Sequence, residues 1–242
     1  MKSVLLIARR ELAATILSPL GFVVAALILA LDGLFFNVFA LATTERRLSA
    51  DVLAQFFYLL SGTTMVTSVL TSMRLIAEEH QSQTIVLLLT SPVKDYQIIL
   101  GKFLGAFSFL ALLTLMTFYM PLLIMVHGKI SFGHLLAGYL GLLLIGSASL
   151  AIGVFGSALS KSQIMAGFLS AAMVVALLMV FNLARIAEKP LNGIFSALAL
   201  HNVHFRPFML GSIHSKDIVY YLSVTVFFLF AATRTLESRR WR

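Results

Sequence analysis

The sequence predicts an all-α, polytopic membrane protein with six transmembrane helices. Hydrophobic residues make up 60% of its 242 residues and charged residues only 12%, whereas soluble globular chains are about 45–50% apolar and about 25% charged. The mean hydropathy is +0.97. A soluble fold could not bury this much apolar surface, so most of the chain is expected to lie in a bilayer as helices that satisfy their own backbone hydrogen bonds.

Six blocks of the sequence are long enough to cross a bilayer, which requires about 20 apolar residues in a helix. We predict spans at 20–41, 53–73, 103–126, 132–158, 163–184 and 218–236, within a single transmembrane domain over 1–242. Six spans place both termini on the same side. Of the 18 Lys and Arg residues, eleven fall on that side and seven on the other, so the positive-inside rule predicts cytoplasmic termini.

Composition and charge exclude several classes of function. The net charge is +8, but the basic residues are scattered between apolar blocks, whereas a nucleic-acid site needs a basic face. The absence of Cys excludes disulfides, thiolate metal sites and Cys nucleophiles. No cleavable signal peptide is expected, because a charged segment precedes the first block and no small-residue cleavage pattern follows it.

The N-terminal segment 1–18 is expected to be an amphipathic helix in the membrane interface. Four of its apolar residues share one arc, and Arg9 and Arg10 lie opposite. Glu11 is an exception, because it falls within the apolar arc. Ser18 and Pro19 then interrupt the helix. The arc consists of Val4, Ile7, Ala8 and Leu12.

The link between the second and third spans, 77–91, is expected to form a short amphipathic helix on the cytoplasmic side. Its apolar run from Ile85 to Leu89 is far too short to cross a bilayer. Glu78 and Glu79 fall in the first turn, where carboxylates complement the helix dipole. Pro92 ends the helix.

The segment 188–216, between the last two spans, is too apolar for a loop and too interrupted by Pro and Gly for a span. Short interfacial or re-entrant helices at the outer face fit best. His201 and His204 could share a helix face, but a metal site needs three or four ligands. We therefore expect no metal site and interpret both as interfacial side chains with their polar tips among the lipid headgroups.

Three polar or small-residue features lie within the predicted spans or next to them. Asp32 is an ionisable residue inside a span, which is by default a functional hypothesis. It could line a substrate path or bond to a neighbouring hydroxyl within the bundle, and both interpretations stay open. The pairs Gly101 with Gly105 and Gly153 with Gly156 could allow helices to approach closely.

Enzymatic motifs are missing from the sequence. No phosphate-binding loop occurs, since Gly101-Lys102 lacks both the upstream Gly and the following hydroxyl residue. The pair Glu78-Glu79 resembles part of a membrane-protease motif, but Gln83 stands where that motif has Arg. The chain is therefore not expected to be an enzyme, or to hydrolyse ATP by itself.

Two regions of the chain resemble one family. Around the link, the resemblance rests on Met73-Arg74, Ala77-Glu78-Glu79, Thr84, Leu87 to Pro92 and Gly101-Lys102-Phe103. Near the C-terminus, it rests on His204-Phe205, Phe208, Gly211, Asp217, Tyr220-Tyr221 and Leu236 to Trp241. With Arg10-Glu11-Leu12 and Ser18-Pro19, these residues resemble the ABC-2 family of ABC-transporter permeases, particularly its gliding-motility-type branch. One departure is Gln83, where the family usually has Gly just before the Thr.

The resemblance implies a six-helix permease subunit that pairs with a second copy or a homologous permease. Each permease would dock one separate ABC ATPase subunit, which binds ATP and Mg²⁺, so this chain needs no cofactor of its own. The complex would be an exporter in the bacterial cytoplasmic (inner) membrane, in contact with membrane lipid. A periplasmic accessory subunit would be a further partner, and nucleic acid would not.

The resemblance also implies a role for each segment outside the spans. The segment 77–91 would be the coupling helix in a groove of the ATPase, flanked by Arg9, Arg10 and Glu11 of the interface helix. The outer segment 188–216 would shape an exit gate. The coupling residues would be Glu78, Glu79, His80, Thr84, Ile85, Leu88, Ser91 and Pro92. The gate residues would be Phe195, His201, His204, Phe205 and Phe208.

Two other functions stay open. The first is a structural or mechanotransmission subunit of an envelope or motility complex, which uses ATPase-driven motion without solute transport. The second is secondary transport with Asp32 as the ion site. The chain has 20 Phe residues, which fits an amphiphilic cargo and equally an ordinary lipid-facing helix, so the composition does not identify a substrate.

Overall fold

The computed structural model describes residues 2–41, 49–84, 93–127, 131–189 and 191–240. These residues form helices and short turns, with no strand among them. Six helical segments are long and apolar enough to cross a membrane, which confirms the prediction of an all-α polytopic membrane protein. They are Pro19–Val38, Ala50–Gln81, Asp95–Met125, Phe132–Leu159, Gln163–Ile186 and Ser215–Ser238.

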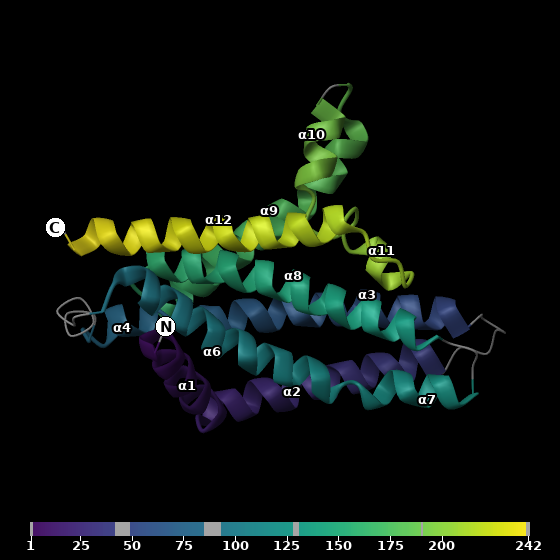
Figure 1. The fold of residues 1–242 in the computed structure, drawn as a ribbon, viewed down its shortest axis with the longest axis horizontal. Helices are drawn as coiled ribbons and strands as arrows, with labels where there is room; N and C mark the ends of the chain where they lie inside the picture. Colours follow the sequence, from purple (N-terminus) through teal and green to yellow (C-terminus); the bar gives the residue numbers. More distant parts are fainter. Residues whose placement is uncertain (1, 42–48, 85–92, 128–130, 190, 241–242) are drawn as a thin grey trace.

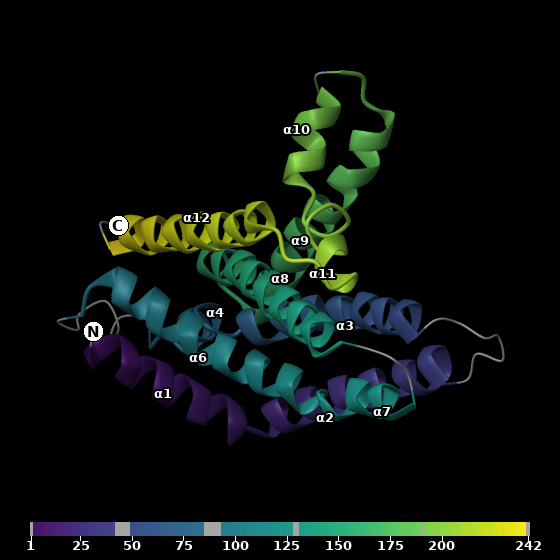
Figure 2. The same cartoon turned by 45° about the vertical axis from the view of Figure 1, so that its right-hand side comes forward.

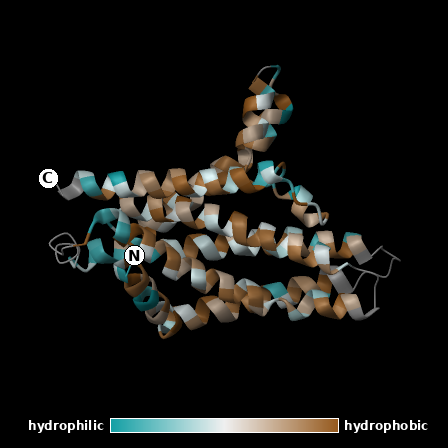
Figure 3. Ribbon diagram, in the orientation of Figure 1, coloured by the Kyte–Doolittle hydropathy of each residue, from teal (hydrophilic) through white to brown (hydrophobic). Residues whose placement is uncertain are grey.

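The long helices run back and forth along the bundle (Figure 1). The start of α1, the short helix α4 and the end of α12 lie at one end, and α7 lies at the other (Figure 1). Figure 3 shows hydrophilic residues concentrated near the helix ends. The elements are α1 (Lys2–Ile16), α2 (Pro19–Phe35), the π-helix η1 (Phe36–Leu41), α3 (Ser49–Ser72), α4 (Ala77–Gln81), α6 (Asp95–Met116), α7 (Tyr119–His127), α8 (Phe132–Leu159), α9 (Gln163–Ile186), α10 (Leu191–Leu198), α11 (Arg206–Met209) and α12 (Ser215–Arg240).

Helix α8 forms the centre of the bundle, and α3, α6, α9 and α12 all pack against it. Two glycines allow this close packing. A Cβ at Gly153 would collide with Ser72 of α3. A Cβ at Gly156 would collide with Ser170 of α9. The prediction that this glycine pair permits close approach of helices is therefore confirmed.

Helix α1 packs along the first half of α6. A Cβ at Gly101 would lie 2.7 Å from the side chain of Ile7. A Cβ at Gly105 would lie 2.6 Å from Cβ of Glu11 and 2.8 Å from the carbonyl oxygen of Ala8. The prediction for this second glycine pair is also confirmed, and the apolar arc of α1 faces α6.

The boundary between α1 and α2 lies at Ser18, as the sequence predicts. Ser18 has extended backbone, and its Oγ accepts a hydrogen bond from the N–H of Gly21 at 2.9 Å. Pro19 occupies the first helical position, where its missing N–H costs nothing because that group would have no partner within the helix. The Ser-Pro pair therefore ends one helix and caps the next.

The third span begins earlier than the predicted 103–126. Helix α6 starts at Asp95, because Lys94 has the extended backbone of an N-cap and its N–H donates to Oε1 of Gln97 at 3.3 Å. Lys102 consequently lies inside the helix instead of before it. Hydropathy alone places the boundary too late, since it counts this Lys as a residue facing water.

The third span is also interrupted, as α6 ends at Met116 and α7 begins at Tyr119. Pro121 follows in the first turn of α7. Because proline has no N–H, it cannot donate to the carbonyl of Thr117 and continue α6 without a break. The hydroxyl of Thr117 turns back and donates to the carbonyl of Thr114 at 2.7 Å.

The end of α9 and α10 form a hairpin that projects from the side of the bundle, whereas the start of α9 packs along α8 (Figures 1 and 2). The two helices pack against each other. Only 17% of the membrane-length window of α9 is buried, against 78% for α8. The large apolar side chains exposed on this hairpin include Met179, Leu183, Ile186, Leu191, Ile194 and Leu198.

We expect Gly105→Ala to destabilise the protein, because the new methyl group must displace the backbone of α1. Overpacking of this kind costs about 1–3 kcal/mol, offset by the better helix propensity of Ala, about 1 kcal/mol. Thermal unfolding followed by circular dichroism measures the effect. The matched control is Gly193→Ala, since nothing lies within 4 Å of a Cβ at that position. Equal unfolding temperatures for the two variants would contradict the tight α1–α6 contact.

Candidate functional site

A buried lysine joins three elements at the α4 end of the bundle. Nζ of Lys102, on α6, lies 3.2 Å from Oε2 of Glu11 on α1 and 3.1 Å from Oε1 of Glu79 on α4. The Lys102 side chain is only 8% exposed, and both Glu side chains are 21% exposed. Ion pairs this sheltered are screened far less than surface pairs. We call these three residues the charged junction.

A small cleft of about 170 Å³ opens beside the charged junction. Arg74 and Glu78 form a further ion pair at its wall, with Nε 3.1 Å from Oε2. Arg10 also lines the cleft, whereas Arg9 is exposed on α1. Positively and negatively charged side chains therefore both line the cleft. The residues that line it are Arg10, Glu11, Ala14, Thr15, Arg74, Glu78, Glu79 and Lys102.

The start of α4 is held by a side chain from another helix. The residue before α4, Ile76, has no side chain that can cap it, and Oγ of Ser157 on α8 accepts from the N–H groups of Ile76 and Ala77 at 3.0 Å each. Ser157 in turn donates to the carbonyl of Met73 at 3.2 Å. A helix start needs partners for its free N–H groups, and here they come from the centre of the bundle.

The expected helix over 77–91 is wrong in its length, because α4 ends at Gln81. Glu78 and Glu79 do lie in its first turn, as predicted, and His80 is half-buried on the same helix. Thr84 follows the turn and donates to Oε2 of Glu79 at 2.6 Å. The predicted coupling residues Ile85, Leu88, Ser91 and Pro92 lie outside the described residues.

Backbone geometry explains the end of α4. Gln83 has a φ of 58°, in the left-handed region that favours glycine. This is the position at which the resemblance noted in the sequence leads us to expect Gly. Gln83 is the non-glycine residue with a positive φ among the described residues.

His201 and His204 are buried, which makes their interpretation as headgroup-facing side chains wrong. Nδ1 of His204 lies 2.7 Å from Oδ1 of Asp217, at the start of α12, and Nε2 lies 3.2 Å from the carbonyl oxygen of Ala197. The His204 ring stacks on Tyr220 with 3.8 Å between centroids. The segment between α10 and α12 folds back over the bundle end, where Asp217 compensates the polar ring.

His201 connects the same segment to α3. Its Nε2 lies 2.7 Å from Oγ of Ser61 and its Nδ1 lies 3.1 Å from Oδ1 of Asn202. Burial lowers the pKa of His201, and the hydrogen bond with Asn202 opposes this shift. The hydroxyl of Ser61 also donates to the carbonyl of Tyr58 at 2.6 Å, so His201 joins this segment to the hydrogen-bonded backbone of α3.

The aromatic residues predicted for the outer gate divide into two groups. Phe205 and Phe208 are fully buried, and a Cβ at Gly141 of α8 would lie 2.6 Å from Cβ of Phe208. Phe195 is half-buried on α10, in the projecting hairpin. The first two anchor the outer segment to the bundle core, while Phe195 does not belong to that core.

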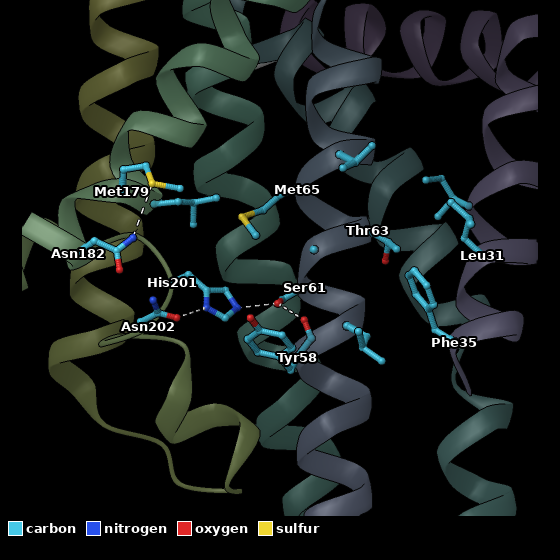
Figure 4. A pocket seen from close by; sticks show the side chains of 15 residues that line it. Leu31, Phe35, Tyr58, Ser61, Thr63, Met65, Met179, Asn182, His201 and Asn202 are labelled. Atoms are coloured by element: carbon cyan, nitrogen blue, oxygen red, sulfur yellow. Dashed lines mark hydrogen bonds between the residues drawn. The ribbon is translucent and has the colours of Figure 1, made fainter. Parts of the chain in front are cut away.

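A pocket of about 520 Å³ lies between α2, α3 and α9. Figure 4 shows hydrogen bonds from Asn202 through His201 to Ser61 on one side, and Leu31 and Phe35 of α2 on the other. The walls are mostly apolar, so the pocket could hold an apolar group with one polar end. The lining residues are Ile28, Leu31, Phe35, Tyr58, Leu59, Ser61, Gly62, Thr63, Met65, Val66, Leu178, Met179, Asn182, His201 and Asn202.

Asp32 does not line this larger pocket. It is 3% exposed on α2 and lines a small cavity with Thr63 of α3, whose hydroxyl donates to the carbonyl of Leu60 at 2.9 Å. Asp32 is thus buried inside the bundle, and both interpretations of its role stay sequence-based predictions.

Comparison with known proteins identifies the family of the chain. A family model described as ABC-2 family transporter protein matches residues 36–233, which include α3 to α11 and most of α12. The chain belongs to the ABC-2 transporter family. A comparison with curated proteins gives no match. Glu79 and Lys102 of the charged junction lie inside the matched region of this ABC-2 protein, and Glu11 lies before it.

Sequence reasoning identified Glu11 and Glu79 but missed Lys102 and Ser157 as site residues. The one available signal was Glu11 itself, a carboxylate on an otherwise apolar arc, which needs a buried cation as its partner. Ser157 had no comparable signal, because serine is common in membrane helices.

We expect Lys102→Met to destabilise this ABC-2 protein by about 3 kcal/mol, because it leaves two sheltered carboxylates facing each other without a cation. Chemical or thermal unfolding of the purified chain checks this. The control is Arg234→Gln, which breaks a solvent-exposed Arg234–Glu237 pair and should cost less than about 1 kcal/mol. Adding Glu11→Gln and Glu79→Gln to Lys102→Met should restore stability. A triple variant that is as unstable as Lys102→Met would contradict the electrostatic explanation.

We expect Gln83→Gly to stabilise the turn after α4 by about 1 kcal/mol, since it removes the Cβ penalty of the left-handed conformation. Amide hydrogen exchange over residues 77–84 measures the local effect. Gln81→Gly is the control, because it lies at the last residue of α4 and also removes the bond from the N–H of Gln163 to Oε1 of Gln81, so it should weaken the end of α4 by about 1 kcal/mol. Faster exchange in Gln83→Gly than in the wild type would contradict the backbone explanation.

Proposed function

We propose that this chain is the permease subunit of an ATP-driven ABC exporter, of the gliding-motility-type branch, which receives motion from a separate ATPase subunit. The observation that carries the proposal is the charged junction, where the short helix α4 is bonded to α1 and α6 through Lys102. The family match supports the class of protein. ATP and Mg²⁺ would be bound by the partner ATPase.

The contacts of α4 provide a route for force in several directions. The helix follows α3 along the chain, with only residues 73–76 between them. Ser157 links its start to α8, and Oε1 of Gln81 accepts from the N–H of Gln163, at the start of α9, at 3.4 Å. Lys102 links it to α6 and α1. A rigid displacement of α4 by an ATPase would therefore reach five helices at once.

The surface of α4 supplies contacts for that ATPase. Glu78 and His80 are half-buried, and the turn residues Ser82 and Gln83 are exposed. Arg9 and Arg10 are exposed on the neighbouring α1. Together they offer a mixed polar surface beside the charged junction. Ile85, Leu88, Ser91 and Pro92 stay sequence-based predictions for the same interface.

The projecting hairpin of α9 and α10 supports pairing with a second permease copy or a homologous permease. Its exposed apolar side chains would contact lipid or another membrane helix. The pocket between α2, α3 and α9 suits an amphiphilic cargo, with the polar end at Ser61 and His201. We place the complex in the bacterial inner membrane with cytoplasmic termini, and with a periplasmic accessory subunit at the opposite end.

Mechanotransmission is the alternative function, and one observation favours it. The outer segment is tied to the bundle by buried bonds, from His201 to Ser61 and from His204 to Asp217. Motion of the bundle would thus be passed to an outer partner as a rigid displacement. Stimulation of ATP hydrolysis by an amphiphile would favour transport, and its absence for the assembled complex would favour mechanical work.

Cross-linking tests the proposed coupling, since the chain has no Cys and single cysteines can be introduced freely. With an ABC ATPase encoded beside this chain, Ser82→Cys carrying a maleimide photo-crosslinker should capture the ATPase. Ser82 is exposed next to α4. Lys189→Cys, exposed at the tip of the projecting hairpin, is the control and should not capture it.

The same two variants test the orientation. A membrane-impermeant maleimide should label Lys189→Cys in intact cells and Ser82→Cys only after the membrane is opened. Labelling of Ser82→Cys from outside would overturn the orientation. Capture of the ATPase by Lys189→Cys but not by Ser82→Cys would overturn the coupling role of the α4 end.

A further inference from the structure

The carboxylate of Asp32 lacks a full set of partners inside the bundle. Asp32 is 3% exposed, and its Oδ1 has no hydrogen-bond partner among the described residues. Thr63 lines the same cavity as the carboxylate, and its hydroxyl donates to the carbonyl of Leu60 at 2.9 Å. A buried ionised carboxylate is strongly unfavourable unless its charge is compensated. Something at this position therefore has to balance the charge.

A small cavity adjoins the carboxylate. Its volume is about 10 Å³, close to the space that one water-sized particle occupies. Its lining comes from α2, α3 and the end of α6, and contains no Lys, Arg or His. The polar groups around it are the side chains of Asp32, Thr63, Thr64, Thr67, Thr114 and Thr117.

The threonine hydroxyls present acceptors to this cavity. Thr67, Thr114 and Thr117 each donate to a backbone carbonyl of the preceding turn, at 2.7, 2.9 and 2.7 Å. A hydroxyl has one proton and two lone pairs, so these oxygens keep only lone pairs for other partners. A carboxylate surrounded by acceptors requires a positively charged or proton-donating partner.

The backbone is irregular on both sides of the cavity. The π-helix η1 starts at Phe36, one turn after Asp32, and π-helical segments occur frequently at functional sites. Helix α6 ends at Met116, next to Thr117. The C-terminal end of a helix carries partial negative charge, and interrupted membrane helices line the ion sites of many transporters. Both features favour a cation at this place.

We propose that Asp32 and the surrounding threonine hydroxyls bind one small monovalent cation, for which Na⁺ is the appropriate probe. One carboxylate neutralises one positive charge, and oxygen donors suit hard cations. A transition-metal site is not indicated, because the described residues contain no group of three His, Cys, Asp or Glu side chains that could hold a metal ion. The site is separate from the charged junction and does not depend on an ATPase.

Protonation of Asp32 is the rival explanation. Tyr139 is the titratable group that interacts with Asp32 electrostatically, and its hydroxyl lies 3.1 Å from Oγ1 of Thr117. No basic side chain lines the cavity. A proton would neutralise the carboxylate but would not use the acceptor oxygens of Thr67 and Thr114, whereas a cation would bind both the carboxylate and these oxygens. The experiment separates these two cases.

Thermal unfolding of the full chain in nanodiscs tests the proposal. Choline chloride is replaced by NaCl at constant ionic strength and neutral pH. We expect a saturable rise of the unfolding temperature, on the order of 3 °C at concentrations well above the dissociation constant. Equilibrium dialysis with radioactive Na⁺ should give one bound ion per chain.

Asp32→Asn and Thr114→Val should each abolish the sodium-dependent shift, and Thr114→Val keeps the carboxylate if the first variant fails to fold. The matched control is Thr71→Val on α3, whose hydroxyl also bonds within its helix, at 2.8 Å to the carbonyl of Thr67, but does not line the cavity. This control should keep the full shift.

Three outcomes would overturn the proposal. The first is an unfolding temperature that is the same in NaCl and choline chloride. The second is a temperature that depends on pH in the wild type but not in Asp32→Asn, with no sodium effect, which would assign a proton to Asp32. The third is a sodium effect that persists in both cavity variants, which would mean that the ion binds elsewhere.

Discussion

One ammonium group between two carboxylates holds together the end of the bundle that bears α4. Helix α4 has only five residues, too few to be stable on its own, and α1 lies outside the six spans. Lys102 brings both against α6, and Gly101 and Gly105 let α1 come near enough for Glu11 to reach it. The glycine pair and the ion pairs therefore depend on each other, since each requires the short distance between α1 and α6.

Polar bonds between distant elements recur at the other end of the molecule. His201 with Ser61 and His204 with Asp217 join the outer segment to α3 and α12. Lipid is as apolar as the side chains of the spans, so burial alone gives helices little preference for one neighbour over another. Directional bonds of this kind select one arrangement. The end opposite α4 is thus specified by polar contacts, and the α4 end by polar contacts together with the close contacts of Gly153 and Gly156 on α8, next to Ser157.

The spans were predictable because bilayer thickness imposes a length that hydropathy can detect. The bonding partners of the site residues were not predictable. Lys102 lies 91 residues from Glu11, and Ser157 lies 81 residues from Ile76, and periodicity carries no information about pairs so far apart in the sequence. Two residues that depart from the expected pattern nevertheless indicated where the site lies. Glu11 interrupted an apolar arc, and Gln83 replaced a glycine. The histidines were misinterpreted because the carboxylate that compensates His204 belongs to the next helix.

The cap that Ser157 provides has a consequence for the order of assembly. Residues 76 and 77 leave the ribosome long before Ser157, so the start of α4 has no partner for its N–H groups until the fourth span has been synthesised and inserted. The surface proposed for the ATPase would therefore mature late, after the centre of the bundle is in place.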